Sequence, residues 1–420
     1  MRIPGRRWLR VAAVTVLTMA GAAVPMVAAA DSAPAGGVSL SATGSVLVQM
    51  RGNGHGHGLS QYGARGAAIA GRSYQQIVAF YYPGTTLKKL IATSIRVRLS
   101  GAGTTTDVFA APKLVLTGVP GALPTAGVSR YRLIADSGTG LTLQRLNSAK
   151  ASTWTTWKTG LPNRAEFHRT DGGVVRLHEA GGASTSYYSY LRTVRGQRTG
   201  ATGGVLTVNR VGLDSYTAGV VPREMPSSWQ PAAVNAQAVA ARSYGRYGVE
   251  HPQSADYDIC DTTSCQVYGG HAHYNSHGSL LWSDYGPAAT ATSNQVLQYQ
   301  GATIFSQFSA SNGGWSVDGG QRYLAARADP YDTSSSGDPY LMYSKVVTVA
   351  SLARYWGFAK LTRITIATRD GHGAWGGRMT SGYADGTDRA GKAKRVRMDG
   401  FGLQAALGIG TTWISLTARS

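Results

Sequence analysis

Short apolar alternations separated by glycine and proline turns dominate the middle of this chain. Between residues 95 and 198 the sequence contains IRVRL, KLVLT, YRLIA and LTLQRL, each only a few residues long. Alternating apolar and polar residues bounded by Gly and Pro are typical of half-buried β-strands. The pattern predicts a small all-β module over residues 91–200. The 55 Gly, 22 Tyr and 9 Trp of the 420 residues fit turns, strands and exposed aromatic surface.

A different pattern follows the module. Residues 208–247 read VNRVGLDSYTAGVVPREMPSSWQPAAVNAQAVAARSYGRY, which we interpret as a strand, a turn that holds Glu224, and an alanine-rich helix that ends in Arg242. Further on, QVLQYQGATIF predicts two strands, VASLARYWGF a helix, and RITIATRD, KRVRMDG and TTWISLT three more strands. The expected fold is a β-rich α+β protein with a few helices, in which residues 204–420 form the core and the β module is inserted.

The N-terminus has the pattern of a secretory signal. Four arginines precede an apolar run from Val11 to Ala23, and three alanines precede Asp31. We expect residues 1–30 to be a signal peptide, exported by either the general or the twin-arginine route, and residues 31–45 to be a linker. No later stretch reaches about 18 apolar residues, so we expect no transmembrane anchor and a location outside the cell or in its wall.

The chain is strongly basic. Its formal net charge is +20, and loss of the signal removes four Arg and no acid, which leaves +16. A basic excess suits nucleic acid, an anionic membrane surface or an anionic polymer, and export favours the anionic polymers of a cell wall over nucleic acid. A solvated basic face without a partner is the alternative.

The two cysteines of the chain, Cys260 and Cys265, lie five residues apart. An exported protein meets an oxidising environment, so this pair predicts a local disulfide. The alternative is a zinc site that recruits His271, His273 and His277. Because the C-x-x-C spacing is absent and the nearest of these histidines is six residues past Cys265, we expect neither a metal nor another cofactor.

Four blocks of sequence together resemble the SpoIID/LytB family, named for stage II sporulation protein D. They are DSYTAGVVPREMPSSWQPAAVNAQAVAARSY, CDTTSCQVYGG, YQGATIFSQFSASNGGWS with RYLAARADPY, and GNGHGHGLSQYGARGAAIAGRSYQQIVAFYYPGTTL. The family places its GHGxGxSQxGA block after the other three, whereas here that block opens the mature chain, within residues 46–90. The resemblance implies a relocated segment that still docks against the same core.

The resemblance also implies an activity. It is that of a lytic transglycosylase, which cleaves peptidoglycan glycan strands between N-acetylmuramic acid and N-acetylglucosamine, preferably after the stem peptides have been removed. Glu224, one of only four glutamates, matches the catalytic Glu of the family. A partly buried Glu with a raised pKa can protonate a glycosidic oxygen.

A transglycosylase differs from a hydrolase in the number of carboxylates it needs. Glycosidases that use water place a second carboxylate about 5 to 9.5 Å from the first. In a transglycosylase the 6-hydroxyl of the sugar attacks instead, so one Glu acts as acid and then as base. Asp214 is the nearest second carboxylate in the sequence, and we interpret it as a residue that holds a turn.

Two residues of the alanine-rich helix are candidates for substrate binding. Arg242 could bind the lactyl carboxylate of a denuded muramic acid, or it could be a cation favoured by the helix C-terminus. Gln237 could contact the substrate or bond only to the backbone beside it.

The remaining candidates lie in glycine-rich loops. The resemblance places His55, Ser60 and Gln61 along the glycan groove, and Ser311 at its border. For Ser60 the alternative is an N-cap of the helix that follows. His57 occupies a position that is usually apolar in the family and receives no role.

Two other classes of function stay open. The LytB side of the family includes proteins regarded as modifiers of wall amidases, so the chain could bind glycan strands or a wall amidase without cutting. A metal-dependent hydrolase would rest on the Cys and His cluster.

Overall fold

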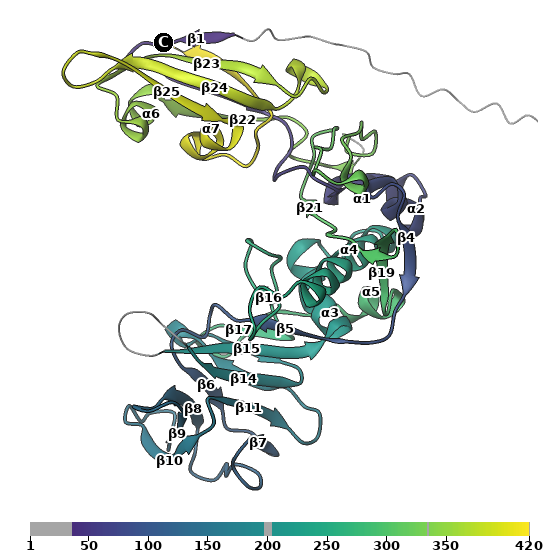
Figure 1. Ribbon diagram of the computed structural model, residues 1–420, viewed down its shortest axis with the longest axis vertical. Coiled ribbons are helices and arrows are strands. Elements are labelled where there is room, and N and C mark those ends of the chain that lie inside the picture. Colours follow the sequence, from purple (N-terminus) through teal and green to yellow (C-terminus); the bar gives the residue numbers. More distant parts are fainter. Residues whose placement is uncertain (1–35, 197–203, 334–335, 420) are drawn as a thin grey trace, which may run out of the picture.

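The structure is a computed structural model that describes residues 36–196, 204–333 and 336–419. The expected signal peptide lies outside these residues. The predicted β-rich α+β fold is confirmed. Three regions follow one another along the longest axis of the molecule: paired β-sheets, a group of helices, and a second β-rich region that holds the C-terminus (Figure 1).

Two sheets build the first region, and all their strand pairs are antiparallel except the parallel pair of β16 and β5. The eight-stranded sheet has the order β10-β9-β8-β6-β12-β13-β17-β18, and the six-stranded sheet has the order β16-β5-β15-β14-β11-β7. Their apolar faces enclose one core, which includes Val97, Tyr131 and Phe167. The strands are β5 (Ser94–Arg98), β6 (Thr106–Phe109), β7 (Leu114–Leu116), β8 (Arg130–Ala135), β9 (Leu141–Leu146), β10 (Thr155–Leu161), β11 (Arg164–Arg169), β12 (Val175–His178), β13 (Ser184–Tyr187), β14 (Tyr190–Arg195), β15 (Val205–Gly212), β16 (Ile259–Cys260), β17 (Ala272–Tyr274) and β18 (Leu280–Ser283).

The sheets continue past the expected end of the β module at residue 200. β15 pairs with β14 and β5 in the six-stranded sheet, and β17 pairs with β13 in the eight-stranded sheet. The module therefore shares both sheets with the segment that carries Glu224. Strand pairing over such sequence distances is not visible in a local alternation pattern.

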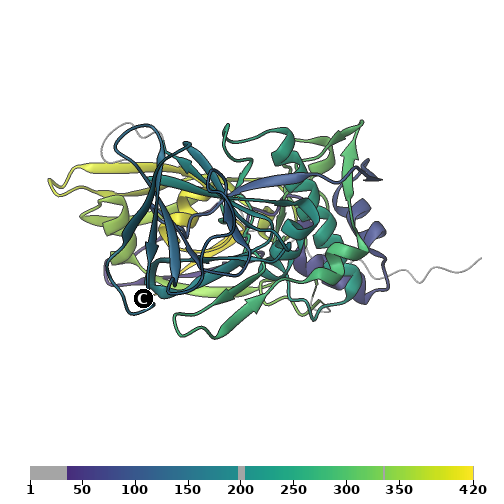
Figure 2. The same cartoon turned by 90° about the horizontal axis from the view of Figure 1, so that it is seen from below.

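The helical region is centred on α4 (Pro231–Glu250). Alanines at 233, 236, 238, 240 and 241 are fully buried, so α1, α2, α3, α5 and β19 all approach this helix. Viewed from below, helices α1 to α5 gather on one side of the molecule (Figure 2). The other elements are α1 (Gln61–Ile69), α2 (Tyr74–Tyr81), α3 (Leu213–Glu224), α5 (Gly286–Ala291), β3 (Leu59–Ser60), β4 (Thr86–Lys89), β19 (Gln295–Tyr299), β20 (Ala302–Thr303), β21 (Phe308–Ser309) and the 3-10 helix η2 (Arg322–Leu324).

The segment before Glu224 corrects one expectation. It is the helix α3, not a turn, and it contains Pro222. Proline has no N–H for the carbonyl four residues earlier, and the Ala218 carbonyl accepts the N–H of Tyr285 instead, at 3.0 Å. The helix α4 likewise continues to Glu250, so Arg242 lies in its interior and not at its end.

The C-terminal region contains the order β1-β23-β24-β25 in one sheet and β22-β2-β26 in another. The predicted helix and strands of this part are confirmed. The segment 46–90 divides between two regions, because β2 pairs with β22 and β26 while α1 and α2 pack against α4. The elements are β1 (Gly37–Ser39), β2 (Ser45–Met50), β22 (Tyr343–Thr348), α6 (Val349–Trp356), β23 (Lys360–Arg369), the 3-10 helix η4 (Ala374–Gly376), β24 (Met379–Thr387), β25 (Ala393–Asp399), α7 (Gly400–Leu407) and β26 (Ile414–Arg419). The 3-10 helix η1 (Ala180–Gly182) lies in the first region.

Within the described residues, every helix is too short or too polar to cross a membrane.

Candidate active site

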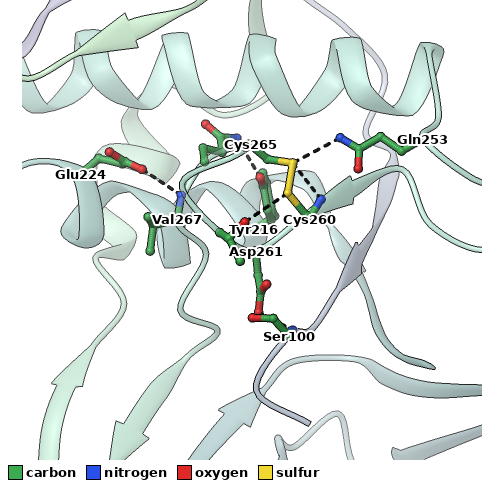
Figure 3. The surroundings of a disulfide bond; sticks show 10 residues. Ser100, Tyr216, Glu224, Gln253, Cys260, Asp261, Cys265 and Val267 are labelled. Atoms are coloured by element: carbon green, nitrogen blue, oxygen red, sulfur yellow. Dashed lines mark hydrogen bonds between the residues drawn. A yellow bond between two sulfur atoms is a disulfide. The ribbon is translucent and has the colours of Figure 1, made fainter. Parts of the chain in front are cut away.

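Glu224 is the last residue of α3, and its carboxylate is held from two directions. Oε1 accepts the backbone N–H of Val267 at 2.9 Å, and Oε2 makes a long contact of 3.5 Å with Nε2 of Gln61. Figure 3 shows the carboxylate pointing at the Val267 nitrogen. Burial raises the pKa of Glu224, while the Val267 N–H, Gln61 and the neighbouring Arg223 act to lower it. Burial prevails, so the acid stays protonated to a higher pH than an exposed Glu does.

The other three glutamates each lie within 4 Å of a basic side chain. Glu166 binds Arg192 and Arg210, Glu250 binds Arg246, and Glu179 lies 3.8 Å from a histidine nitrogen. In the part of the chain that the structure describes, Glu224 alone of the four has no such partner within 4 Å. It is therefore the glutamate most available for proton transfer.

The predicted disulfide joins Cys260 to Cys265 and is confirmed. It closes the loop immediately before Val267 (Figure 3). Between the two, the buried Gln266 side chain donates to Tyr216 Oη at 2.8 Å and to the Ala241 carbonyl at 3.0 Å. The disulfide and these bonds fix the backbone that presents its N–H to Glu224.

The glycine-rich block brings the Gln61 side chain to Glu224, whereas the side chain of the preceding Ser60 points into the protein. Ser60 is the N-cap of α1: its Oγ accepts the N–H of Gly63 at 3.1 Å and donates to Asp332 Oδ2 at 3.0 Å. The capping alternative for Ser60 is confirmed, and this fully buried side chain does not line a groove. Gln61 follows as the first residue of α1 and is the member of the block that touches the acid.

The His55 ring bonds to its own loop and to the backbone of Phe308. Its Nδ1 accepts the N–H of His57 at 2.9 Å. Burial, with His57 and Arg378 nearby, lowers the pKa of His55 to about 4, so the ring is neutral at pH 7. No hydrogen bond joins His55 to Glu224 among the described residues.

Arg242 is fully buried, and its guanidinium is occupied inside the protein. Nε donates to Asp214 Oδ1 at 2.6 Å, and the other nitrogens donate to Thr292 Oγ1 at 3.0 Å and to the Ala289 carbonyl at 2.9 Å. This geometry corrects the expected contact with a sugar carboxylate, because a buried guanidinium needs all its partners within the fold. Asp214 holds structure, as expected, and also accepts from Ser293 Oγ at 2.5 Å.

Gln237 and Ser311 are both fully buried. The amide nitrogen and oxygen of Gln237 have no hydrogen-bond partner in the described part of the chain, so the alternative of a backbone bond is wrong. Ser311 Oγ lies 3.0 Å from Asp332 Oδ2 and 2.6 Å from Asp338 Oδ2, within a buried polar cluster. It supports the loop and does not border a groove, which corrects the expectation for this residue.

The three histidines of the zinc alternative are not brought together. His271 pairs with Asp284 at 3.2 Å, His273 contacts Thr185 Oγ1 at 2.8 Å, and His277 is exposed in a turn. Across residues 36–196, 204–333 and 336–419, no group of three His, Cys, Asp or Glu side chains has a geometry that could hold a metal ion.

Sequence reasoning missed the Val267 N–H. Every residue except proline carries such a donor, so only the path of the backbone reveals this one.

Comparison with known proteins identifies the central part of the chain. Residues 201–299 match the model of the SpoIID family, described as stage II sporulation protein. This range includes α3, α4, the disulfide loop and β17–β18.

Three relatives align with parts of the chain. An amidase enhancer of Bacillus subtilis is 37% identical over 122 residues, which cover 27% of this chain and 15% of the relative. An uncharacterized protein of Brachyspira hyodysenteriae is 35% identical over 111 residues, or 26% of this chain and 28% of the relative. Stage II sporulation protein D of Bacillus subtilis is 26% identical over 167 residues, or 36% of this chain and 47% of the relative. The chain thus spans less than half the length of each.

Proposed function

Because this chain is a SpoIID-like protein, we propose that it is a secreted lytic transglycosylase of peptidoglycan, with Glu224 as its only acid and base. The observation that carries the proposal is the state of Glu224. It is partly buried, without an ion pair in the described structure, and has a raised pKa, while a backbone N–H keeps one carboxylate oxygen in place.

The reaction needs one group that gives and then takes a proton. Protonated Glu224 donates to the oxygen between C1 of N-acetylmuramic acid and C4 of N-acetylglucosamine, and the C1–O bond breaks. The resulting carboxylate accepts the proton of the muramic 6-hydroxyl as O6 bonds to C1. The products are a 1,6-anhydromuramic end and a free 4-hydroxyl, and no water is consumed.

The ion pair of Asp214 speaks against the hydrolytic route that the sequence offered. Hydrolysis calls for a second carboxylate free to act as nucleophile or base. Asp214, the candidate from the sequence, is bound to the buried Arg242. Gln61 and Val267 offer neutral hydrogen bonds that accommodate either protonation state of Glu224.

A second candidate function rests on the match to the amidase enhancer. In this alternative the protein binds glycan strands, or a wall amidase, and modifies that enzyme without cutting. Loss of the Glu224 carboxylate would then leave the function intact.

The test is mass spectrometry of amidase-treated glycan strands after incubation with the wild-type protein or with Glu224→Gln. We expect 1,6-anhydromuramic ends with the wild type only. Reducing ends would identify a hydrolase, and no cleavage by either protein would favour the binding function. Glu166→Gln, which alters a glutamate already paired with two arginines, is the control for loss of a carboxylate elsewhere.

A further inference from the structure

A hollow near Glu224 is lined by residues of the β-sheets and by Arg223 and Val267. It has a volume of about 520 Å³, within the usual range for small-ligand sites of about 300–1,000 Å³. Two of its lining residues are joined directly to the acid: Arg223 precedes Glu224 in the chain, and Val267 donates its N–H to the carboxylate. A ligand in this hollow would be next to the reacting group.

The β module and the core build this hollow together. Strand registers place Thr185 opposite His273, and His273 opposite Trp282. Directly paired residues of antiparallel strands point to the same face, so these three side chains form one row across β13, β17 and β18. Glu179 adjoins the row from the connection after β12.

Trp282 has a fixed orientation in the row. It is partly exposed, and its ring packs against Gly269, where an added Cβ would lie 2.0 Å from a ring carbon. The Arg223 guanidinium is 5.2 Å from the ring centroid, and the His273 ring is inclined by only 17° to the indole. An indole held in this way presents an apolar, polarisable surface suited to the C–H face of a pyranose.

The polar members of the row supply hydrogen-bond acceptors. Thr185 Oγ1 donates to Glu179 Oε1 at 2.6 Å and lies 2.8 Å from His273 Nδ1. The threonine proton is directed at Glu179, so the contact between Thr185 Oγ1 and His273 is a hydrogen bond in the tautomer that carries the proton on Nδ1. In that tautomer Nε2 of His273 is an acceptor for hydroxyl or amide N–H groups, as is Oε2 of Glu179, and Arg223 offers a donor for a carboxylate.

We infer that this hollow is a sugar subsite, which binds an N-acetylhexosamine unit of the glycan strand adjacent to the bond at Glu224. Trp282 stacks on the sugar ring, Glu179 and His273 accept from its polar groups, and Arg223 binds the lactyl carboxylate when the unit is muramic acid. The inference rests on the proposed action on glycan strands. It gives the β module a role: the module supplies the outer wall of the subsite.

Binding of peptide-free glycan oligosaccharides of defined length, measured by calorimetry, tests the subsite. All variants are made in the Glu224→Gln protein, so that no substrate is consumed. We expect Trp282→Ala to weaken binding about tenfold or more, Glu179→Gln to weaken it severalfold, and Trp282→Phe to restore most of it. Tyr355→Ala, which removes an exposed aromatic ring on α6, is the matched control and should bind as the parent does.

The outcomes separate the subsite from the catalytic proposal. If the parent binds oligosaccharides and a folded Trp282→Ala binds equally well, the subsite is overturned while the transglycosylase proposal stands. If Trp282→Ala loses binding and wild type forms no anhydro ends, the subsite stands and the catalytic proposal falls. If only strands that carry stem peptides bind through Trp282, or if no glycan binds at all, the sugar subsite is wrong.

Discussion

At the scale of single residues, burial of Glu224 couples the chemistry to stability. Its pKa is raised in the folded protein, so the folded state holds this proton more tightly than the unfolded state. Stability from this group is therefore present below the unfolded pKa and is lost as pH rises through the folded value. We predict that Glu224→Gln unfolds at a higher temperature than wild type near pH 7 and that the difference shrinks toward pH 4. Thermal unfolding of both proteins between pH 4 and pH 7 measures this difference. A difference in unfolding temperature that grows as the pH falls would contradict the prediction.

Replacement of Arg242 should destabilise the protein, in contrast to Glu224→Gln, because the charge of Arg242 is buried and paired. Replacement by Ala leaves Asp214 without its partner and opens a space in α4. We expect the free energy of unfolding to fall by about 3 kcal/mol, the lower end for a broken buried pair, because the Asp214 side chain is partly exposed. Denaturant titration measures this loss. The control is Arg223→Ala, which replaces an exposed arginine and should change stability little. If Arg242→Ala were as stable as wild type but bound glycan less well, Arg242 would be a substrate-binding residue after all.

At the scale of elements, the disulfide loop tunes the acid. Replacing both Cys260 and Cys265 with Ser should cost about 2 kcal/mol of stability, since the closed loop is short. It should also weaken the hydrogen bond from the Val267 N–H to Glu224. Because this bond lowers the pKa of Glu224, weakening it raises that pKa. We therefore predict that the basic limb of the cleavage profile moves to higher pH, because an acid with a higher pKa stays protonated longer. A double mutant with lower stability but an unchanged pH profile would restrict the disulfide to a structural role.

Sequence reasoning predicted the features that depend on local signals and missed those that depend on distant contacts. The strands around Val97 and Tyr131 and the disulfide were predictable because their signals are local. The helix α3 was not, because proline is unfavourable within a helix and the bond from Tyr285 to the Ala218 carbonyl comes from a distant segment. Burial of Arg242 and the row of Thr185, His273 and Trp282 depend on contacts between distant segments. The place of Gln61 in the groove was expected only through family resemblance, and its contact with Glu224 was not predicted.

At the scale of the whole molecule, charge separates wall attachment from glycan recognition. The expected mature chain has a net charge of +16. Exposed cations such as Arg389, Lys392 and Arg397 lie on β25 or in the connection before it, and Figure 1 shows β25 far from α3, which ends at Glu224. Attraction between exposed charges is screened over about 8 to 10 Å at moderate ionic strength. We predict that sedimentation with intact cell walls falls severalfold between about 0.05 and 0.5 M NaCl.

The matched variant reverses these three cations to Glu, which lowers the net charge by six, from +16 to +10. It should bind intact walls weakly even at low salt. On walls stripped of anionic polymers, wild type and variant should bind alike and with little salt dependence, because the sugar subsite relies on stacking and short hydrogen bonds. If neither salt nor charge reversal changed the amount of protein that sediments with intact walls, glycan contacts alone would hold the protein. The basic surface would then be only a solvated face.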